Sequence, residues 1–195
     1  MPHDYSKAPP PRNLDLIPHG TICAVIMQIV PGPAGLLWRS TAGDCEMLKV
    51  KFTVTDGPYA RKQFWENMII VGTTPGQKQM AETWEGTRKA ILESARNIKP
   101  KDMSEAAMQA RHVESYGDFD GLCFVAKIGV KKGEPKQDGS GNYPDKNVLL
   151  EAITPDHKQW HSVEQPPQSP KSSGAAAAPP ASGGGQIVQR PEWGR

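Results

Sequence analysis

The sequence contains few cysteines and no cysteine pair at a metal-binding spacing. Cys23, Cys45 and Cys123 are the only ones among 195 residues, and no C-x-x-C is present. The odd number argues against a disulfide framework, and the missing pair argues against a zinc site built from cysteines. Each thiol lies in an apolar run, so we expect three buried, free cysteines of a protein from a reducing compartment.

Long hydrophobic runs are also missing. No stretch approaches the roughly 18 apolar residues that a membrane-spanning helix needs. Residues 1–18 are rich in proline and lack the apolar centre of a signal peptide. We therefore expect a protein of the cytoplasm, with residues 1–18 as an extended, proline-rich N-terminal segment.

Neither sign of charge dominates the chain. The 23 lysines and arginines nearly balance the 21 aspartates and glutamates, which leaves a net charge of +2. A protein of this balance is not a polycation that coats nucleic acid by charge alone. A site for nucleic acid would have to come from local clustering of basic residues.

Motifs that mark catalysis or metal binding are not found. His157 and His161 have helical spacing, but the glutamate of H-E-x-x-H is absent between them. Residues 72–78 lack the spacing of a phosphate-binding loop, which favours a plain strand-to-helix connection. Residues 138–142 have no downstream glutamate for calcium and predict a hairpin tip. We expect a non-catalytic protein without cofactor or metal.

The chain does contain a series of segments with β-strand patterns. Residues 45–55 alternate cleanly, with Leu48, Val50, Phe52 and Val54 on one face and polar or charged residues on the other. This period of two is typical of a half-buried strand. Further strands are predicted at residues 21–30, 63–71, 121–131 and 147–153, and residues 36–41 lead into a turn at residues 42–44.

The hydrophobic period changes to that of a helix between residues 77 and 95. Apolar or neutral residues recur there at Met80, Trp84, Thr87, Ile91 and Ala95. A capping-box sequence at residues 102–105 predicts a second, short helix. The order β-β-β-α-β-β is that of the OB fold, so we expect a mainly β domain over residues 19–160, built as a five-stranded OB-like barrel.

Residues 161–195 differ from the rest in composition. They are dominated by proline, serine, glycine and alanine. Such a segment cannot bury enough apolar area to offset the entropy of ordering, so we expect a disordered tail. Its last residues include Ile187, Val188 and Trp193, which either form a docking motif on a tether or simply end the chain.

Basic residues alternate with aromatic ones along the predicted strands. Single-stranded nucleic acid is bound by cations that contact phosphates and by rings that stack on bases. The candidate binding residues are Trp38, Arg39, Lys49, Lys51, Arg61, Lys62, Trp65, Lys127 and Lys131. Two alternatives stay open: outward lysines also form solvated faces that protect sheet edges, and Trp65 could pack under the helix. Glu46, Asp56 and Glu66 are close in sequence and weaken the basic patch.

Residues 49–67, KVKFTVTDGPYARKQFWEN, resemble a segment of phage and prophage single-stranded DNA-binding proteins. In both, a strand ending in Asp-Gly-Pro-Tyr is followed by a basic pair, an aromatic residue and a polar strand. The likeness covers about residues 20–155, including the helix and the segment 143–147 before the last strand. It implies sequence-tolerant binding of single-stranded DNA in phage replication or recombination, on an OB-like fold.

The end of the chain departs from the related pattern. Bacterial single-stranded DNA-binding proteins usually end in an acidic tip with a terminal phenylalanine, whereas residues 191–195 here are PEWGR. Recruitment of replication or recombination proteins through the tail is therefore open, as is homo-oligomer formation. The low net charge favours a second hypothesis, a protein-interaction module that binds a phage recombinase or nuclease.

Overall fold

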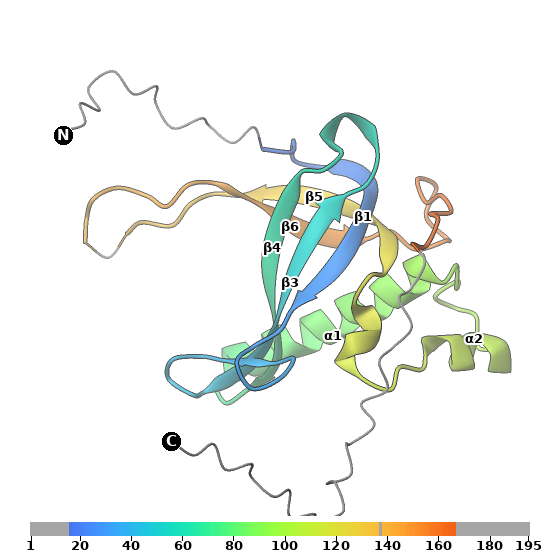
Figure 1. Ribbon diagram of the computed structural model, residues 1–195, viewed down its shortest axis with the longest axis horizontal. Helices are drawn as coiled ribbons and strands as arrows, with labels where there is room; N and C mark the ends of the chain where they lie inside the picture. Colours follow the sequence, from blue (N-terminus) through green and yellow to red (C-terminus); the bar gives the residue numbers. More distant parts are fainter. Residues whose placement is uncertain (1–15, 137, 167–195) are drawn as a thin grey trace, which may run out of the picture.

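The computed structural model describes residues 16–136 and 138–166. In this part an antiparallel sheet curves around one core, and helices cover one side of it (Figure 1). Most of the predicted N-terminal segment (residues 1–18) and of the predicted C-terminal tail (residues 161–195) lies outside the described residues. The same holds for Ile187, Val188 and Trp193, so the docking motif stays a prediction.

The sheet has six strands, and five of them are the predicted ones. They are β1 (Thr21–Val30), β2 (Trp38–Arg39), β3 (Cys45–Val54), β4 (Gln63–Gly72), β5 (Cys123–Lys131) and β6 (Lys146–Ala152). All pairings are antiparallel, in the order β4-β3-β1-β5-β6. The short β2 pairs with the first part of β3, where the sequence had indicated only a lead into a turn.

The sheet is mainly antiparallel but unclosed. β4 and β6 are its two end strands, and they approach each other across the core. No backbone ladder joins them within the described part of the chain. The prediction of a mainly β domain with a helix between β4 and β5 is confirmed. The strands of the predicted five-stranded barrel are paired as an open sheet and do not form a closed, hydrogen-bonded ring.

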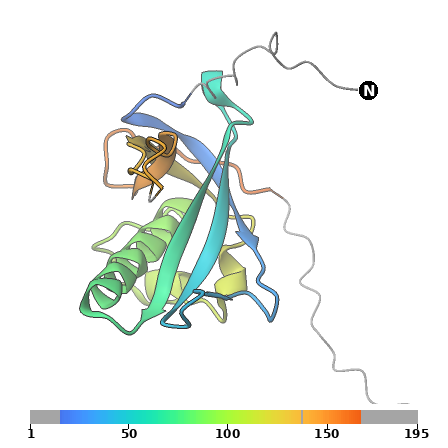
Figure 2. The same ribbon diagram turned by 90° about the vertical axis from the view of Figure 1, so that its left-hand side faces the viewer.

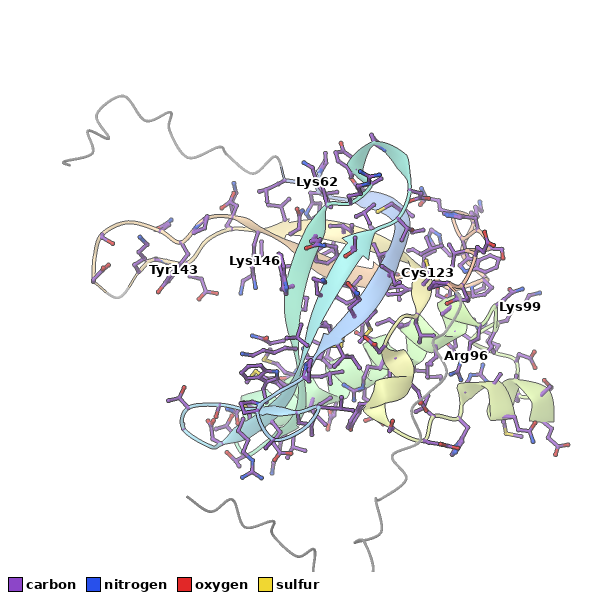
Figure 3. All side chains as sticks on the ribbon, viewed as in Figure 1. Lys62, Arg96, Lys99, Cys123, Tyr143 and Lys146 are labelled. Carbon is purple, nitrogen blue, oxygen red and sulfur yellow. The ribbon has the colours of Figure 1, made fainter. Side chains whose placement is uncertain are left out.

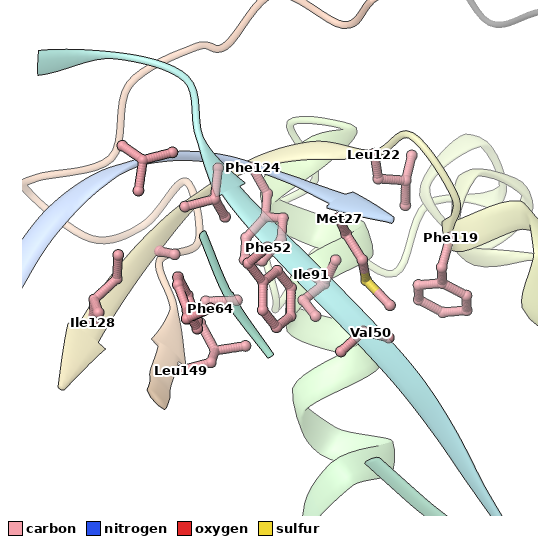
Figure 4. Packing of buried hydrophobic residues seen from close by; sticks show 14 of the residues in the cluster. Met27, Val50, Phe52, Phe64, Ile91, Phe119, Leu122, Phe124, Ile128 and Leu149 are labelled. Atoms are coloured by element: carbon pink, nitrogen blue, oxygen red, sulfur yellow. The ribbon is translucent and has the colours of Figure 1, made fainter. Parts of the chain in front are cut away.

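The core confirms the alternation found in residues 45–55. The side chains of Leu48, Val50, Phe52 and Val54 are all buried. Phe52 lies at the centre, with its ring centroid 5.1 Å from that of Phe64 and 5.9 Å from that of Phe124 (Figure 4). These aromatic contacts join β3, β4 and β5 into one core, as cross-strand aromatic pairs commonly do.

The long helix α1 (Pro75–Ala95) begins two residues before the predicted start. Thr74 caps it, since its hydroxyl accepts a hydrogen bond from Gln77 N–H, and Pro75 suits a first helical turn. Ile91 contributes to the core, but Met80, expected on the same buried stripe, is half exposed. The reason is positional: the buried side chains of α1 lie in its second half, where it crosses the core.

The predicted second helix is present as α2 (Glu105–Arg111). Its N-cap is Ser104, whose hydroxyl oxygen accepts a hydrogen bond from Ala107 N–H. The Asp102 carboxylate accepts a hydrogen bond from Ser104 N–H, before the helix begins. Two one-turn 3-10 helices, η1 (Gly57–Tyr59) and η2 (Tyr116–Phe119), complete the described elements. No helix within them is long and apolar enough to cross a membrane.

Both ends of the described chain are fastened to the sheet. Ile17 was predicted to belong to the extended N-terminal segment, which has little to bury, yet it is only 1% exposed. Its backbone N–H and carbonyl oxygen form two hydrogen bonds with the Asn147 side chain. Gln165, placed in the tail, donates to the carbonyl oxygen of Cys123 and accepts from its N–H. The packed structure therefore extends slightly beyond residues 19–160 at both ends.

The three cysteines are free and buried, as predicted. Burial, and next the charge of Asp56, raise the pKa of the Cys23 thiol to about 11. Burial also raises the pKa of the Cys123 thiol. Thiols held in this way stay protonated at neutral pH, so they behave as small apolar core residues.

Candidate nucleic-acid interface

Four of the outward side chains of β3 and β4 form a compact polar surface, which we call the β3–β4 face: Lys49, Lys51, Trp65 and Asn67. The strand register places Lys51 opposite Trp65 and Lys49 opposite Asn67. Directly opposed side chains on one face of a sheet lie about 5 Å apart at Cβ. Figure 2 shows α1 on one side of β3 and β4, so these residues occupy the side away from the helix.

Trp65 is the exposed aromatic of this face. Its side chain is 56% exposed, so it does not pack under the helix, which was the alternative open from sequence. A ring that is exposed beside Lys51 has the arrangement that base stacking requires, with a cation placed for the neighbouring phosphate.

Trp38, predicted to stack on a base, has two contacts within the protein. Its indole Nε1–H donates to the carbonyl oxygen of Val30 at 2.8 Å, which fixes the ring. The Lys49 Nζ lies 3.6 Å from the centroid of that ring, a cation–π contact. One face of the indole is thus in contact with Lys49.

The acidic residues near this surface have other partners than its lysines. Glu46 forms an ion pair with Arg39 at 2.9 Å, and Asp56 accepts a hydrogen bond from Ala24 N–H. Glu66 lies on the inward face of β4, between two buried residues. Within the described residues, no carboxylate forms an ion pair with Lys49 or Lys51. The three acids therefore make their contacts with groups other than these two lysines.

Arg61 and Lys62 lie at one end of the face, just before β4. Arg61 has a left-handed backbone (φ 72°), and its N–H bonds to the Val54 carbonyl oxygen, which closes the turn between β3 and β4. Lys62 lies 5.7 Å from the Tyr59 ring centroid, and Figure 3 shows it at this end of β4. Both cations can extend the face toward η1.

Lys127 is not brought to the β3–β4 face. It is opposite Ile22 on β1, whereas Lys51 is opposite Gln28 on the same strand. Six residues of a strand span roughly 20 Å. Lys127 also lies opposite Glu151 of β6, so it belongs to a separate part of the surface.

Lys131 lies at the base of a long hairpin, residues 132–145, which we call the arm and which projects past β4 (Figure 1). Its Nζ is 2.8 Å from a carboxylate oxygen of Glu134. Lys132 is similarly paired with Asp145 at 2.8 Å. The hydrogen bond and charge of each carboxylate raise the pKa of its lysine. Lys131 and Lys132 are therefore both paired with carboxylates, whereas the Lys136 side chain has, within the described residues, only a ring contact with Tyr143.

Three further residues of this region are not among the nine candidate binding residues. Asn67 completes the β3–β4 face, and its outward position followed from the period-two pattern of β4. Tyr143 is exposed on the arm, with Lys136 Nζ 6.0 Å from its ring centroid. Lys146 is opposite Lys131 at the base of the arm. This pairing depends on the register of β5 and β6, which cannot be predicted from the sequence because a long loop separates the two strands.

A hollow lies beside Ala24 and Ile26 of β1, and its lining includes Thr55, Asp56, Cys123 and His161. His161 Nε2 is 3.8 Å from an Asp56 carboxylate oxygen. The raised pKa of Cys123 removes the thiolate that nucleophilic chemistry would need. Within the described chain, no three His, Cys, Asp or Glu side chains are grouped to hold a metal ion, and His157 with His161 makes no such group.

Comparisons with known proteins identify no relative: no protein-family model, no curated protein and no solved structure matches this chain.

Proposed function

We propose that the protein binds single-stranded DNA without strong sequence preference, through the β3–β4 face. The observation that carries the proposal is the register that sets exposed Trp65 beside Lys51, with Lys49 one pair further along. Neither lysine has a carboxylate partner among the described residues. Stacking on every kind of base and contact with phosphates are both tolerant of sequence.

The topology supports the same proposal. With β2 set aside, the strands follow the order of an OB fold, and α1 lies between the third and fourth of them. OB folds bind oligonucleotides on their second and third strands and on the adjoining loops. Those strands correspond here to β3 and β4, and the loops to residues 31–44 and the arm. We therefore propose an OB-like domain, with a role in phage replication or recombination as the sequence resemblance implies.

The test is a fluorescence anisotropy titration of a labelled single strand of about 30 nucleotides, long enough for more than one OB site. We expect tight binding at about 50 mM salt, a steep loss by about 200 mM salt, and poor competition by duplex DNA. Duplex that competes as well as single strand would contradict the proposal, because stacking on Trp65 needs unpaired bases.

The second candidate is an accessory module that binds a protein of phage recombination. Met103 and Met108, at the beginning and middle of the α2 region, are exposed apolar side chains away from the β3–β4 face. Methionine is frequent at adaptable binding surfaces. Absence of DNA binding at low salt, together with recovery of a recombinase or nuclease in a pull-down that a double change of these methionines to serine abolishes, would favour this function.

A further inference from the structure

The two end strands of the sheet meet along a seam that lacks a backbone ladder. β4 and β6 contact each other there. One hydrogen bond joins them within the described residues: Leu149 N–H of β6 donates to a Glu66 carboxylate oxygen of β4 at 3.3 Å. A side chain thus takes the place that a backbone carbonyl would occupy in a closed barrel.

Glu66 is an unusual residue for its position. It lies between Phe64 and Met68 on the inward face of β4, opposite Val50 of β3, and these three side chains are buried. Burial raises the pKa of Glu66, while the charges of Lys146 and Lys131 act in the opposite direction. An apolar side chain would fill this position without the cost of burying a carboxyl group, so the acid is there for its acceptor or its charge.

The charge of Glu66 acts at the base of the arm. Lys131 and Lys146 are directly opposite each other in the β5–β6 pairing. Like charges in such a pair destabilise a sheet. Both lysines are close enough to Glu66 for their charges to lower its pKa. Figure 3 shows Lys146 beside β4. Glu66 therefore links β4 to β6 through Leu149 and to the arm through the two lysines.

We propose that Glu66 is a positioning residue that joins β6 to β4 and so fixes the direction in which the arm projects past β4. This connection is a property of the protein alone. Its effect on the affinity for DNA rests on the proposed function, because the position of the arm changes that affinity only if the protein binds DNA.

The first experiment compares the full-length variants Glu66→Gln and Glu66→Met. Glutamine keeps an oxygen acceptor, and methionine fills a similar volume without one, so no cavity is created. Amide hydrogen exchange followed by NMR measures the Leu149 N–H. We expect exchange about tenfold faster in Glu66→Met and within about threefold of wild type in Glu66→Gln. Glu151→Met, on the outward side of β6, is the matched control and should leave Leu149 unchanged.

The second measurement follows the arm itself. Spin labels at Ser140→Cys on the arm and Lys78→Cys on α1 report their distance distribution, and the native cysteines are buried. We expect a broader distribution and severalfold weaker binding of a 30-nucleotide single strand in Glu66→Met. Glu66→Gln keeps the acceptor for Leu149 but not the charge beside Lys131 and Lys146, so both of its values should lie between those of Glu66→Met and wild type. Unchanged Leu149 exchange, or an unchanged distance distribution, in Glu66→Met overturns the inference. A wild-type protein that does not bind DNA overturns the proposed function but leaves these two protein-only readouts decisive.

Discussion

The β3–β4 face and the arm both carry basic and aromatic residues, yet they differ in how the cations are partnered. On the face, Lys49 lies over an indole ring, and neither it nor Lys51 has a carboxylate partner among the described residues. At the base of the arm, Lys131 forms an ion pair with Glu134 at 2.8 Å, and on the arm Lys132 forms one with Asp145 at 2.8 Å. A count of lysines in the sequence treats the two regions alike, whereas the structure pairs Lys131 and Lys132 with carboxylates and leaves Lys49 and Lys51 without such a partner among the described residues.

The difference follows from local geometry. In a strand, neighbouring residues point to opposite sides, so Glu66 can be adjacent in sequence to Trp65 and still lie on the other side of the sheet. In a narrow hairpin, residues of the two branches are close whatever their order, so Lys132 meets Asp145. Alternation therefore separates unlike charges on the face, and the hairpin brings them together on the arm.

The largest expected effect comes from charge reversal on the face. Lys49→Glu with Lys51→Glu should weaken binding of single-stranded DNA by about 100-fold or more at low salt, because two phosphate contacts become repulsive. Anisotropy titrations at several salt concentrations measure both the affinity and its salt slope, which should become shallower by about two.

The matched control for this variant is Lys132→Glu with Lys136→Glu on the arm. It makes the same change in net charge, but we expect a loss of less than about tenfold, since Lys132 is already paired. Equal losses for the two double variants would show that overall charge, and not the β3–β4 face, governs binding.

The next effect concerns the exposed rings of the two regions. Trp65→Ala should weaken binding by about tenfold to 100-fold, in line with roughly 1–3 kcal/mol for stacking on one base. Because the side chain is mostly exposed, thermal unfolding should stay close to that of wild type. Tyr143→Ala on the arm is the comparison, and we expect a loss below about fivefold; the reverse ranking would move the stacking site to the arm.

The smallest effect is a gain, obtained by releasing an arm lysine. The hydrogen bond from Lys132 lowers the pKa of Asp145, so this pair stays charged at neutral pH and is lost only on acidification through that lowered pKa. Asp145→Asn frees Lys132 at neutral pH and should strengthen binding about twofold to fivefold, with a slightly steeper salt slope. A titration that shows no gain would place the arm outside the path of the DNA.

Much of the fold could be predicted because it depends on local patterns. The alternation of Leu48, Val50 and Phe52 predicted both the strand and its buried side, and the spacing of Trp84 and Ile91 predicted the helix. The unclosed seam between β4 and β6 could not be predicted, because it depends on how far the whole sheet curves. A signal was nevertheless present in the sequence: Glu66 interrupts the apolar row formed by Phe64 and Met68.

The candidate site was predicted in composition more than in arrangement. Lys49, Lys51 and Trp65 share one surface because the short connection between β3 and β4, residues 55–62, is closed by backbone hydrogen bonds that set their register. Lys127 and Lys131 lie on a strand that reaches the sheet only after two helices, so no local pattern fixes where it pairs. The contact between Lys49 and Trp38 depends on the fold of the loop before β3 and left no trace in spacing.

The most direct test of the account is to locate the DNA on the protein. Titration of the isotope-labelled protein with a short oligothymidylate, followed by NMR, resolves the indole N–H signals together with the backbone. The account predicts large shifts for the Trp65 indole and for the amides of Lys49, Lys51 and Asn67, with Trp84 and Trp160 unchanged. Shifts confined to α2 or to the arm, with the Trp65 indole unmoved, would contradict the assignment of the β3–β4 face as the binding site.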